Sequence, residues 1–298
     1  MPGDAIDLRT TLGWFPERRD FVVAAGPDAV DYLQGQLSQD IEALAVGSSA
    51  RSFVLQPTGK VDAWVRVTRT GADEVVLDLD EGHGDALAAR LRRFLLRTKA
   101  DIDPLGWQAV ALRGPGAAGT TPTVAAENAL VLPAGWPGVE GVDLLGPTVE
   151  PPPGIPEADA SAYASLRIRS GVPLMGAELT DGTIPAEAGE WVIDASVSFT
   201  KGCFTGQELV ARIDSRGGHV PRHLRGLLVR AAERPAAGAP VVVDGADVGT
   251  VTSTAWAPGT DQGVALAYIR RGVTPPAAAE VRYGDEALPV TVVDLPMA

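Results

Sequence analysis

The chain has 298 residues, 45% of them hydrophobic, which is enough to bury the core of a globular protein of two or three domains. Its 38 acidic and 25 basic residues give a formal net charge of −13, which disfavours direct binding of nucleic acid and of anionic membrane surfaces. We find neither a signal-peptide pattern nor an apolar run near the roughly 18 residues of a transmembrane helix, so we expect a cytoplasmic protein without a membrane partner.

The chain has a single cysteine, Cys203. With one cysteine the chain cannot form an internal disulfide. A single thiolate also cannot supply the usual ligands of an iron-sulfur cluster or a structural zinc ion. Any cluster would therefore be shared or transient. His219 and His223 have the spacing of a helical metal pair, but Pro221 between them disfavours a continuous helix. We expect no metal site.

The first part of the chain predicts a strand followed by an amphipathic helix. A short apolar run over 21–25 indicates the strand. After Asp28, apolar residues recur at helical spacing before Gly47, at Val30, Leu33, Leu37, Ile41 and Leu44.

The next part predicts a hairpin and a second helix. Apolar and other residues alternate over 61–67 and again over 75–79, with Gly71 in the turn between them. Asp85 is a candidate helix cap, and the apolar stripe that follows it consists of Leu87, Leu91, Phe94 and Leu95.

Two composition changes mark the rest of the chain. Gly, Pro, Ala and Thr dominate from Gly114 to Pro156, which predicts loops, short edge strands and a crossing between domains. From about Leu224, short Val-rich runs alternate with Asp-Gly, Pro-Gly and Gly-Asp pairs, which predicts a small antiparallel barrel.

The strongest local motif is KGCFTGQE at 201–208. Thr205 and Glu208 have the spacing of a capping box and predict a helix that begins just after Cys203. A thiol at a helix N-terminus beside Lys201 would have a pKa lowered from about 8.5 into the range of about 3.5 to 7.5, which favours a reactive thiolate. The sequence leaves open the alternative that Cys203 is a small buried apolar residue.

This motif, extended to KGCFTGQELVAR, closely resembles the signature of the YgfZ family. These proteins are relatives of the glycine cleavage T-protein, an aminomethyltransferase, and they act in iron-sulfur protein maintenance, including that of tRNA modification enzymes. Further blocks resemble the family in the expected order, at 31–41, 55–64, 93–102, 166–179 and 184–190. The resemblance implies an α+β fold of three domains in a ring around a folate pocket, with a C-terminal antiparallel β-barrel.

The resemblance, the change of pattern at Arg51 and the Pro-rich stretch near Pro151 together suggest three domains. We expect residues 1–50 and 155–218 to form a discontinuous first domain that carries the cysteine motif. Residues 51–154 would form a ferredoxin-like α+β domain, and residues 219–298 the barrel.

The resemblance also implies a cofactor, tetrahydrofolate or a derivative, and residues that bind it. Glu187 in IPAEAG falls where T-proteins place a glutamate against the pterin ring. Arg97 and Lys99 match a basic pair suited to the anionic glutamyl tail, and Gln207 in the motif is assigned to cofactor binding. Without the resemblance, Glu187 would be a local cap or a solvent-exposed loop residue, and the basic pair the solvated face of a helix.

One departure bears on activity. T-proteins carry an Asp-Asp pair, one carboxylate of which serves aminomethyl transfer, where this chain has Ala63 and Trp64. Asp62 is a poor substitute, because in a strand it faces the side opposite to Ala63. We therefore do not expect a classical aminomethyltransferase.

The leading hypothesis is a folate-binding accessory factor for assembly or repair of iron-sulfur proteins, which would be its partners. Cys203 would be the reactive thiol and Lys201 would tune it. The alternatives are a folate-dependent aminomethyltransferase and a non-catalytic scaffold.

Overall fold

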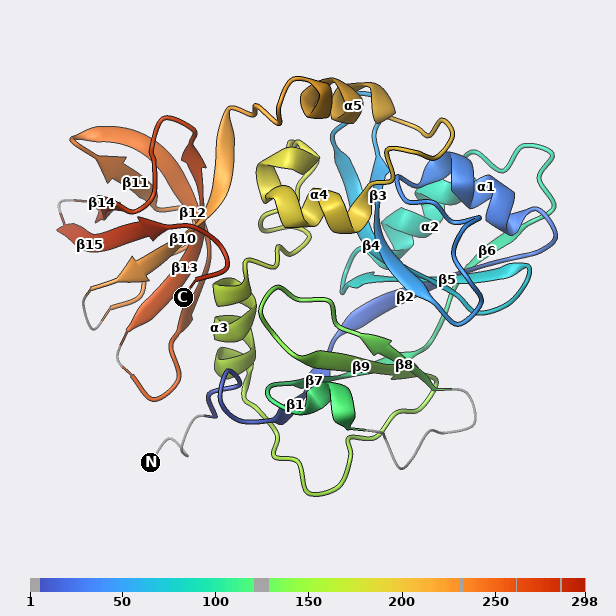
Figure 1. The fold of residues 1–298 in the computed structure, drawn as a ribbon, viewed down its shortest axis with the longest axis horizontal. Helices are drawn as coiled ribbons and strands as arrows, with labels where there is room; N and C mark the ends of the chain where they lie inside the picture. The colour runs from blue at the N-terminus through green and yellow to red at the C-terminus, as the bar shows by residue number, and fades with distance from the viewer. Residues whose placement is uncertain (1–5, 121–128, 231–232, 261, 285, 298) are drawn as a thin grey trace.

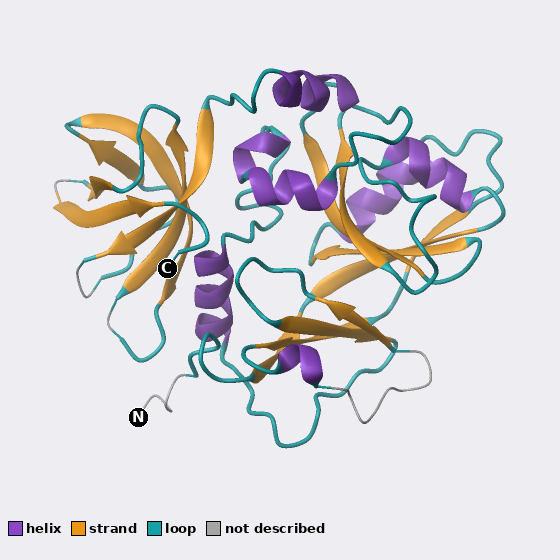
Figure 2. Cartoon of the chain, viewed as in Figure 1, coloured by secondary structure: helices purple, strands orange, loops and turns teal. Residues whose placement is uncertain are grey.

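The computed structural model describes residues 6–120, 129–230, 233–260, 262–284 and 286–297. They form three lobes around a common centre: a closed barrel on the left of Figure 1, a five-stranded sheet on the right and a four-stranded sheet below. Strands build every lobe, whereas several helices lie where the lobes meet (Figure 2). The expected α+β class is confirmed, and so is the C-terminal antiparallel barrel.

The five-stranded sheet is antiparallel throughout and has the order β3-β4-β5-β2-β6. Its strands are β2 (Arg19–Ala25), β3 (Ser49–Leu55), β4 (Val61–Arg69), β5 (Glu74–Asp80) and β6 (Asp101–Pro104). Helices α1 (Ala29–Gln36) and α2 (Gly84–Arg92) share a buried apolar core with it. The predicted strand at 21–25 and the hairpin of β4 and β5 are confirmed.

Both predicted helices in this lobe are shorter than expected. Helix α1 ends at Gln36 because Leu37 is extended and bridges to Val54 in β3. Leu37 and Ile41 are nevertheless fully buried, so the apolar spacing reported the core correctly and the helix length wrongly. Helix α2 begins one residue before Asp85 and ends before Phe94, which is 46% exposed.

The four-stranded sheet has the order β1-β7-β9-β8. Its strands are β1 (Gly13–Glu17), β7 (Gln108–Arg113), β8 (Leu130–Pro133) and β9 (Gly141–Gly146), with the short helix η1 (Ala117–Gly119) after β7. The region predicted as loops and short edge strands thus contributes two of the four strands, the short edge strand β8 and the inner strand β9. Its part at 121–128 lies outside the described residues.

Sheet membership corrects the expected boundary near residue 50. Strand β2 and helix α1 precede it but belong with β3 to β6, whereas β7 to β9 follow it and the sheet they form includes β1. The change of pattern at Arg51 therefore marks a strand, β3, rather than the start of a domain. Pairing between strands that are distant in the sequence decides which strands share a sheet. A local sequence pattern cannot predict that pairing.

The described helices after β9 are α3 (Ala160–Ser170), η2 (Pro185–Ala188), α4 (Glu190–Ser196) and α5 (Gln207–Ser215). Helix α3 begins at Asp159, whose side chain accepts a hydrogen bond from the backbone N–H of Ala162 at 2.7 Å. It ends at Gly171, which adopts a left-handed conformation, and it packs against β12 of the barrel.

The barrel closes in the order β10-β13-β12-β11-β14-β15. Its strands are β10 (Arg222–Val229), β11 (Pro240–Val243), β12 (Ala246–Trp256), β13 (Gly263–Arg270), β14 (Ala277–Tyr283) and β15 (Glu286–Val293). Alternating apolar residues fill its interior, as the Val-rich runs predict.

A buried network of ions joins the two sheets. Arg66 of β4 donates to Asp78 of β5 at 2.9 Å and to Asp143 of β9 at 2.7 Å. Arg113 of β7 donates to the other oxygen of Asp143 at 2.7 Å, and Arg19 donates to Asp78. Arg66, Arg113, Asp78 and Asp143 are at most 3% exposed. Burial alone would raise the pKa of Asp143, but the guanidinium groups of Arg113 and Arg66 outweigh it and hold that pKa below its ordinary range.

Replacing Asp143 by Asn should destabilise the protein by about 3–5 kcal/mol, because two buried guanidinium groups then lose their shared carboxylate. Urea unfolding would measure this loss. The matched control is Asp247→Asn, at an exposed position of β12, which should stay within about 0.5 kcal/mol of wild type.

The difference in the free energy of unfolding between wild type and Asp143→Asn should also depend on pH. Because the folded-state pKa of Asp143 lies below its ordinary value of 3.8, its stabilisation is present above pH 3.8 and is lost as the pH falls through the folded-state value. The gap between wild type and Asp143→Asn should therefore narrow in acid. A loss below about 1 kcal/mol at neutral pH would contradict a central role for this network.

Candidate functional site

Lys201 fixes the cysteine motif to the end of helix α1. Its Nζ donates hydrogen bonds to the backbone carbonyls of Gln34 at 2.5 Å, Leu37 at 2.7 Å and Gln39 at 2.9 Å. The last carbonyls of a helix lack partners within the helix and carry the negative end of its dipole, so a cation suits this place. The segment before Cys203 is thereby attached to the five-stranded lobe.

The surroundings of Lys201 have opposing effects on the pKa of its ammonium group. Burial lowers the pKa of Lys201 to about 8, opposed by the nearby carboxylates of Asp40 and Glu42. Its three carbonyl acceptors require the protonated form, because a neutral amine has only two hydrogens to donate. Nζ also lies 5.3 Å from the centre of the Phe204 ring. The structure thus shows an anchoring role, and the tuning of Cys203 by Lys201 stays a prediction.

Cys203 is exposed, so the alternative of a buried apolar cysteine is wrong. The predicted capping box is also wrong. Helix α5 begins at Gln207 after Gly206, which has a φ of 79° and no side-chain cap, so the thiol lies outside the helix. A side chain at Gly206 would meet Leu55 at 2.8 Å, which explains why glycine is needed where the motif packs on β3.

Gln207 shapes the turn after the cysteine. Its Oε1 accepts a hydrogen bond from the backbone N–H of Phe204 at 3.1 Å, and the backbone N–H of Thr205 donates to Gly35 at 3.1 Å. These contacts and the Lys201 anchor hold Cys203 on both sides while its side chain remains accessible.

Glu187 lies in η2 and is only 3% exposed. Its Oε2 accepts from the backbone N–H of Ile184 at 3.3 Å and from Arg222 of β10 at 3.0 Å. The guanidinium of Arg222 in turn stacks over Tyr268 at 4.3 Å. The local cap suggested as an alternative is present, together with an ion pair to the barrel. Both contacts use Oε2, and among the described residues none uses Oε1.

Arg97 and Lys99 lie on the exposed loop between α2 and β6, not on a helix face as the alternative supposed. Arg97 has a left-handed backbone with a φ of 62°. The backbone N–H of Lys99 donates to the carboxylate of Asp28 at 2.8 Å, which ties the loop to the start of α1. Within the described residues neither side chain forms an ion pair.

Trp64 occupies the centre of the molecule and is 4% exposed. Its indole N–H donates to Ser196 of α4 at 2.9 Å, and the ring meets Trp191 edge-on at 6.1 Å. Ala63 faces the separate core beneath α2. The expectation that Asp62 faces the opposite side is wrong: a bulge in β4 places Asp62 in the same small cavity as Ala63, where it forms an ion pair with Arg90 at 3.1 Å. An indole and a methyl group therefore stand where we align the T-protein carboxylates.

The structure contains several cavities near the meeting point of the lobes. One of about 510 Å³ lies between α4 and the barrel and is lined by Ala188, Gly189 and Trp191, next to Glu187. Another of about 410 Å³ lies between the two sheets. None of the predicted site residues lines either cavity. These residues are Lys201, Cys203, Gln207, Glu187, Arg97 and Lys99.

Sequence reasoning missed a role for Arg51, which it used only to mark a change of pattern. Arg51 of β3 stacks over the Trp64 ring at 4.4 Å and lines the cavity of about 410 Å³. The available signal was an arginine within a strand that ends in a run of buried apolar residues.

Across the described parts of the chain, no cluster of three or more His, Cys, Asp or Glu side chains is placed to hold a metal ion. No helix there combines the length and apolar character needed to cross a bilayer.

Comparisons with known proteins agree with this architecture. Residues 222–298 match the family model of the glycine cleavage T-protein C-terminal barrel domain. The crystal structure of the glycine cleavage system aminomethyltransferase T from Bartonella henselae superimposes with a TM-score of 0.77, at 20% identity, over 98% of this chain and 88% of that chain. The expected T-protein-like fold is confirmed.

Sequence relatives extend over most of the chain. An aminomethyltransferase of Streptomyces avermitilis is 27% identical over 92% of this chain and 83% of its own length. One from Rubrobacter xylanophilus is 28% identical over 97% and 84%. An uncharacterized protein of Haemophilus influenzae is 28% identical over 64% of this chain and 65% of its own length, just under two thirds of that protein.

Replacing Lys201 by Met should release the motif from α1, because three backbone carbonyls lose their donor. Hydrogen exchange of amides over 197–206 and at the end of α1 should accelerate about tenfold or more, while the barrel stays unchanged. Lys60→Met, at a half-buried lysine, is the matched control. Unchanged exchange over 197–206 would show that the anchor is dispensable.

Proposed function

We propose that the protein is a cytoplasmic, folate-binding accessory factor for the assembly or repair of iron-sulfur proteins, which are its partners, with Cys203 as its reactive thiol. The observation that carries this proposal is the exposed Cys203, held on an anchored segment of a T-protein-like fold whose central carboxylate position holds Trp64. By this resemblance the chain lacks the carboxylate that serves aminomethyl transfer in T-proteins. It carries an accessible thiol instead.

The chemistry of a single accessible thiol limits what the protein does alone. A thiolate is both a nucleophile and a metal ligand. One thiolate cannot hold an iron-sulfur cluster, so the remaining ligands come from the client protein or a small molecule. We therefore infer that the protein acts on a client instead of storing a cluster.

The surroundings of Glu187 support a folate site. Oε1 of Glu187 is available to accept a hydrogen bond from a pterin ring N–H, whose donors suit a carboxylate. The adjacent cavity of about 510 Å³ is within the range for small-molecule sites, and Trp191 supplies an aromatic wall. Gln207 retains its amide NH₂, because its contact to Phe204 uses Oε1.

Aminomethyl transfer is the second candidate, because relatives spanning 92% and 97% of the chain carry that name. Against it stands the buried contact of Trp64 with Ser196, which leaves no room for a carboxylate at that position. Asp62 lies at a bulge of β4 on the side of α2, and its carboxylate is already paired with Arg90 at 3.1 Å.

Calorimetry with tetrahydrofolate and its 5-formyl derivative should show saturable binding to the wild type. Glu187→Gln should weaken binding about tenfold or more, because a neutral amide replaces the charged acceptor for the pterin. Glu280→Gln, at an exposed position of β14 away from this cavity, should bind as wild type. Equal affinity of both variants would remove Glu187 from the site, and no binding by the wild type would favour the scaffold alternative.

Replacing Arg97 and Lys99 together by Gln should weaken a polyglutamylated folate much more than the monoglutamate, because only the longer tail brings additional carboxylates. The difference should shrink as salt is added, since contacts between exposed charges are screened beyond about 10 Å at 0.1 M. Equal losses for both ligands, measured by the same calorimetry, would show that the pair is not a tail site.

A further inference from the structure

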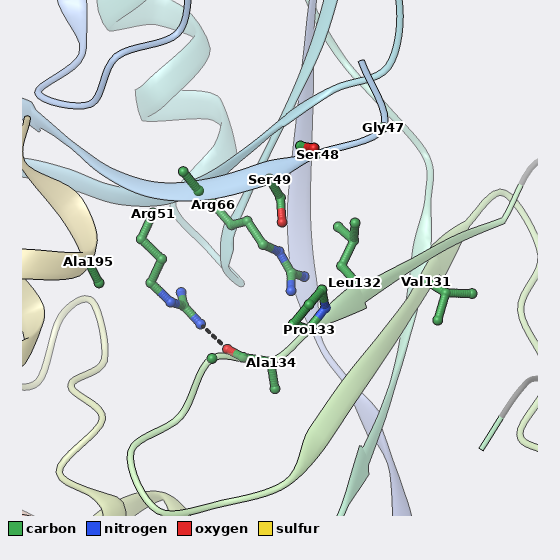
Figure 3. A pocket seen from close by; sticks show the side chains of 12 residues that line it. Gly47, Ser48, Ser49, Arg51, Arg66, Val131, Leu132, Pro133, Ala134 and Ala195 are labelled. Carbon is green, nitrogen blue, oxygen red and sulfur yellow. Dashed lines mark hydrogen bonds between the residues drawn. The ribbon is translucent and has the colours of Figure 1, made fainter. Parts of the chain in front are cut away.

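The cavity between the two sheets has an unusual charge. It has a volume of about 410 Å³, and its charged lining residues are two arginines, Arg51 and Arg66. Ser48 and Ser49 add hydroxyl groups, and no aspartate or glutamate lines it. Figure 3 shows both guanidinium groups extending from their strands toward the β8 end of the opposite sheet.

The strand register creates this concentration of charge. Arg51 of β3 stands directly opposite Arg66 of β4, so both side chains leave the same face of the sheet. Like charges directly opposite each other across a strand pair are destabilising, and such a pair needs compensation. Arg66 receives it from Asp78 and Asp143.

Arg51 has no such partner. Among the described residues, no carboxylate lies within 4.0 Å of its guanidinium. One of its five N–H donors reaches the carbonyl of Ala134 at 3.3 Å, and its plane stacks over Trp64 at 4.4 Å. Burial, with the charges of Arg66 and Arg19, lowers the pKa of Arg51 to about 10, against the opposing effect of the carboxylates of Asp78 and Asp143. An incoming anion would give this guanidinium the direct partner that it lacks.

We propose that this cavity is a binding site for the carboxylate or phosphate group of a small molecule, with Arg51 as the charged donor and Ser48 and Ser49 beside it. The fork of a guanidinium matches both groups through two parallel hydrogen bonds. Trp64 holds the plane of Arg51 by stacking, so the fork is oriented before the ligand arrives. The site is distinct from the cavity beside Glu187 and does not depend on the function proposed above.

The cavity is also connected to the cysteine motif. Ala195 of α4 forms part of its wall, and the carbonyl of Ala195 accepts a hydrogen bond from the side chain of Gln39 at 3.3 Å. The backbone carbonyl of Gln39 in turn receives Nζ of Lys201. Anion binding therefore takes place two contacts away from the anchor of Cys203.

Titration of the purified protein with inorganic phosphate and with glutarate, followed by calorimetry and by the indole N–H resonance of Trp64, tests the site. Wild type should bind at least one of these anions saturably, and the Trp64 signal should shift. Arg51→Gln should weaken that binding at least about tenfold, whereas Arg282→Gln, at an exposed arginine of β14, should not change it. Arg51→Gln should melt no earlier than wild type, because it removes a charge that lacks a direct partner.

The source of the anion is distinguished by competition. If 5-formyl-tetrahydrofolate displaces the anion, the site receives the carboxylates of a folate; if both bind together, it receives a separate metabolite. Should Arg51→Gln fail to fold, Arg51→Lys keeps the charge but lacks the planar fork and should bind several-fold more weakly. Absence of saturable binding of both anions, or unchanged affinity in the Arg51 variants, overturns the inference, whatever the result of the folate titration.

Discussion

Arg66 donates to a carboxylate of its own sheet, Asp78, and to a carboxylate of the other sheet, Asp143. Every group involved is almost completely removed from water, so separating the sheets would leave charges buried without partners. The network therefore fixes how the five-stranded and four-stranded sheets face each other. The cavity lined by Arg51 and Arg66 lies between the two sheets that this network joins (Figure 3).

The core beside this network belongs to several lobes at once. Phe53 and Trp64 come from β3 and β4, Trp136 from the loop before β9, and Tyr163 from α3. Such a buried aromatic core suits a structural junction and not a carboxylate that must take part in a reaction. The accessible thiol belongs to a different segment, which Lys201 fixes to α1. The fold is shared with an aminomethyltransferase structure at 20% identity, and a shared fold does not by itself fix the chemistry at its centre.

Periodicity predicted the elements whose partners are near in sequence. The hairpin of β4 and β5 and the strands of the barrel follow from alternation, because one face of each is buried. The contacts that define the site could not be predicted this way, since Arg66 and Asp143 are 77 residues apart and Lys201 lies 167 residues from Gln34. Local rules failed at Thr205, because Gly206 with a φ of 79° precedes helix α5 and the helix begins at Gln207 without a side-chain cap.

The reactive thiol is the central element of the proposed function, and Cys203→Ser tests it with little change in volume. In cells that lack their own copy of the gene, wild type should restore the activity of an iron-sulfur enzyme, and Cys203→Ser should not, although it folds and binds folate as wild type does. Full restoration by Cys203→Ser would contradict a working role for the thiol.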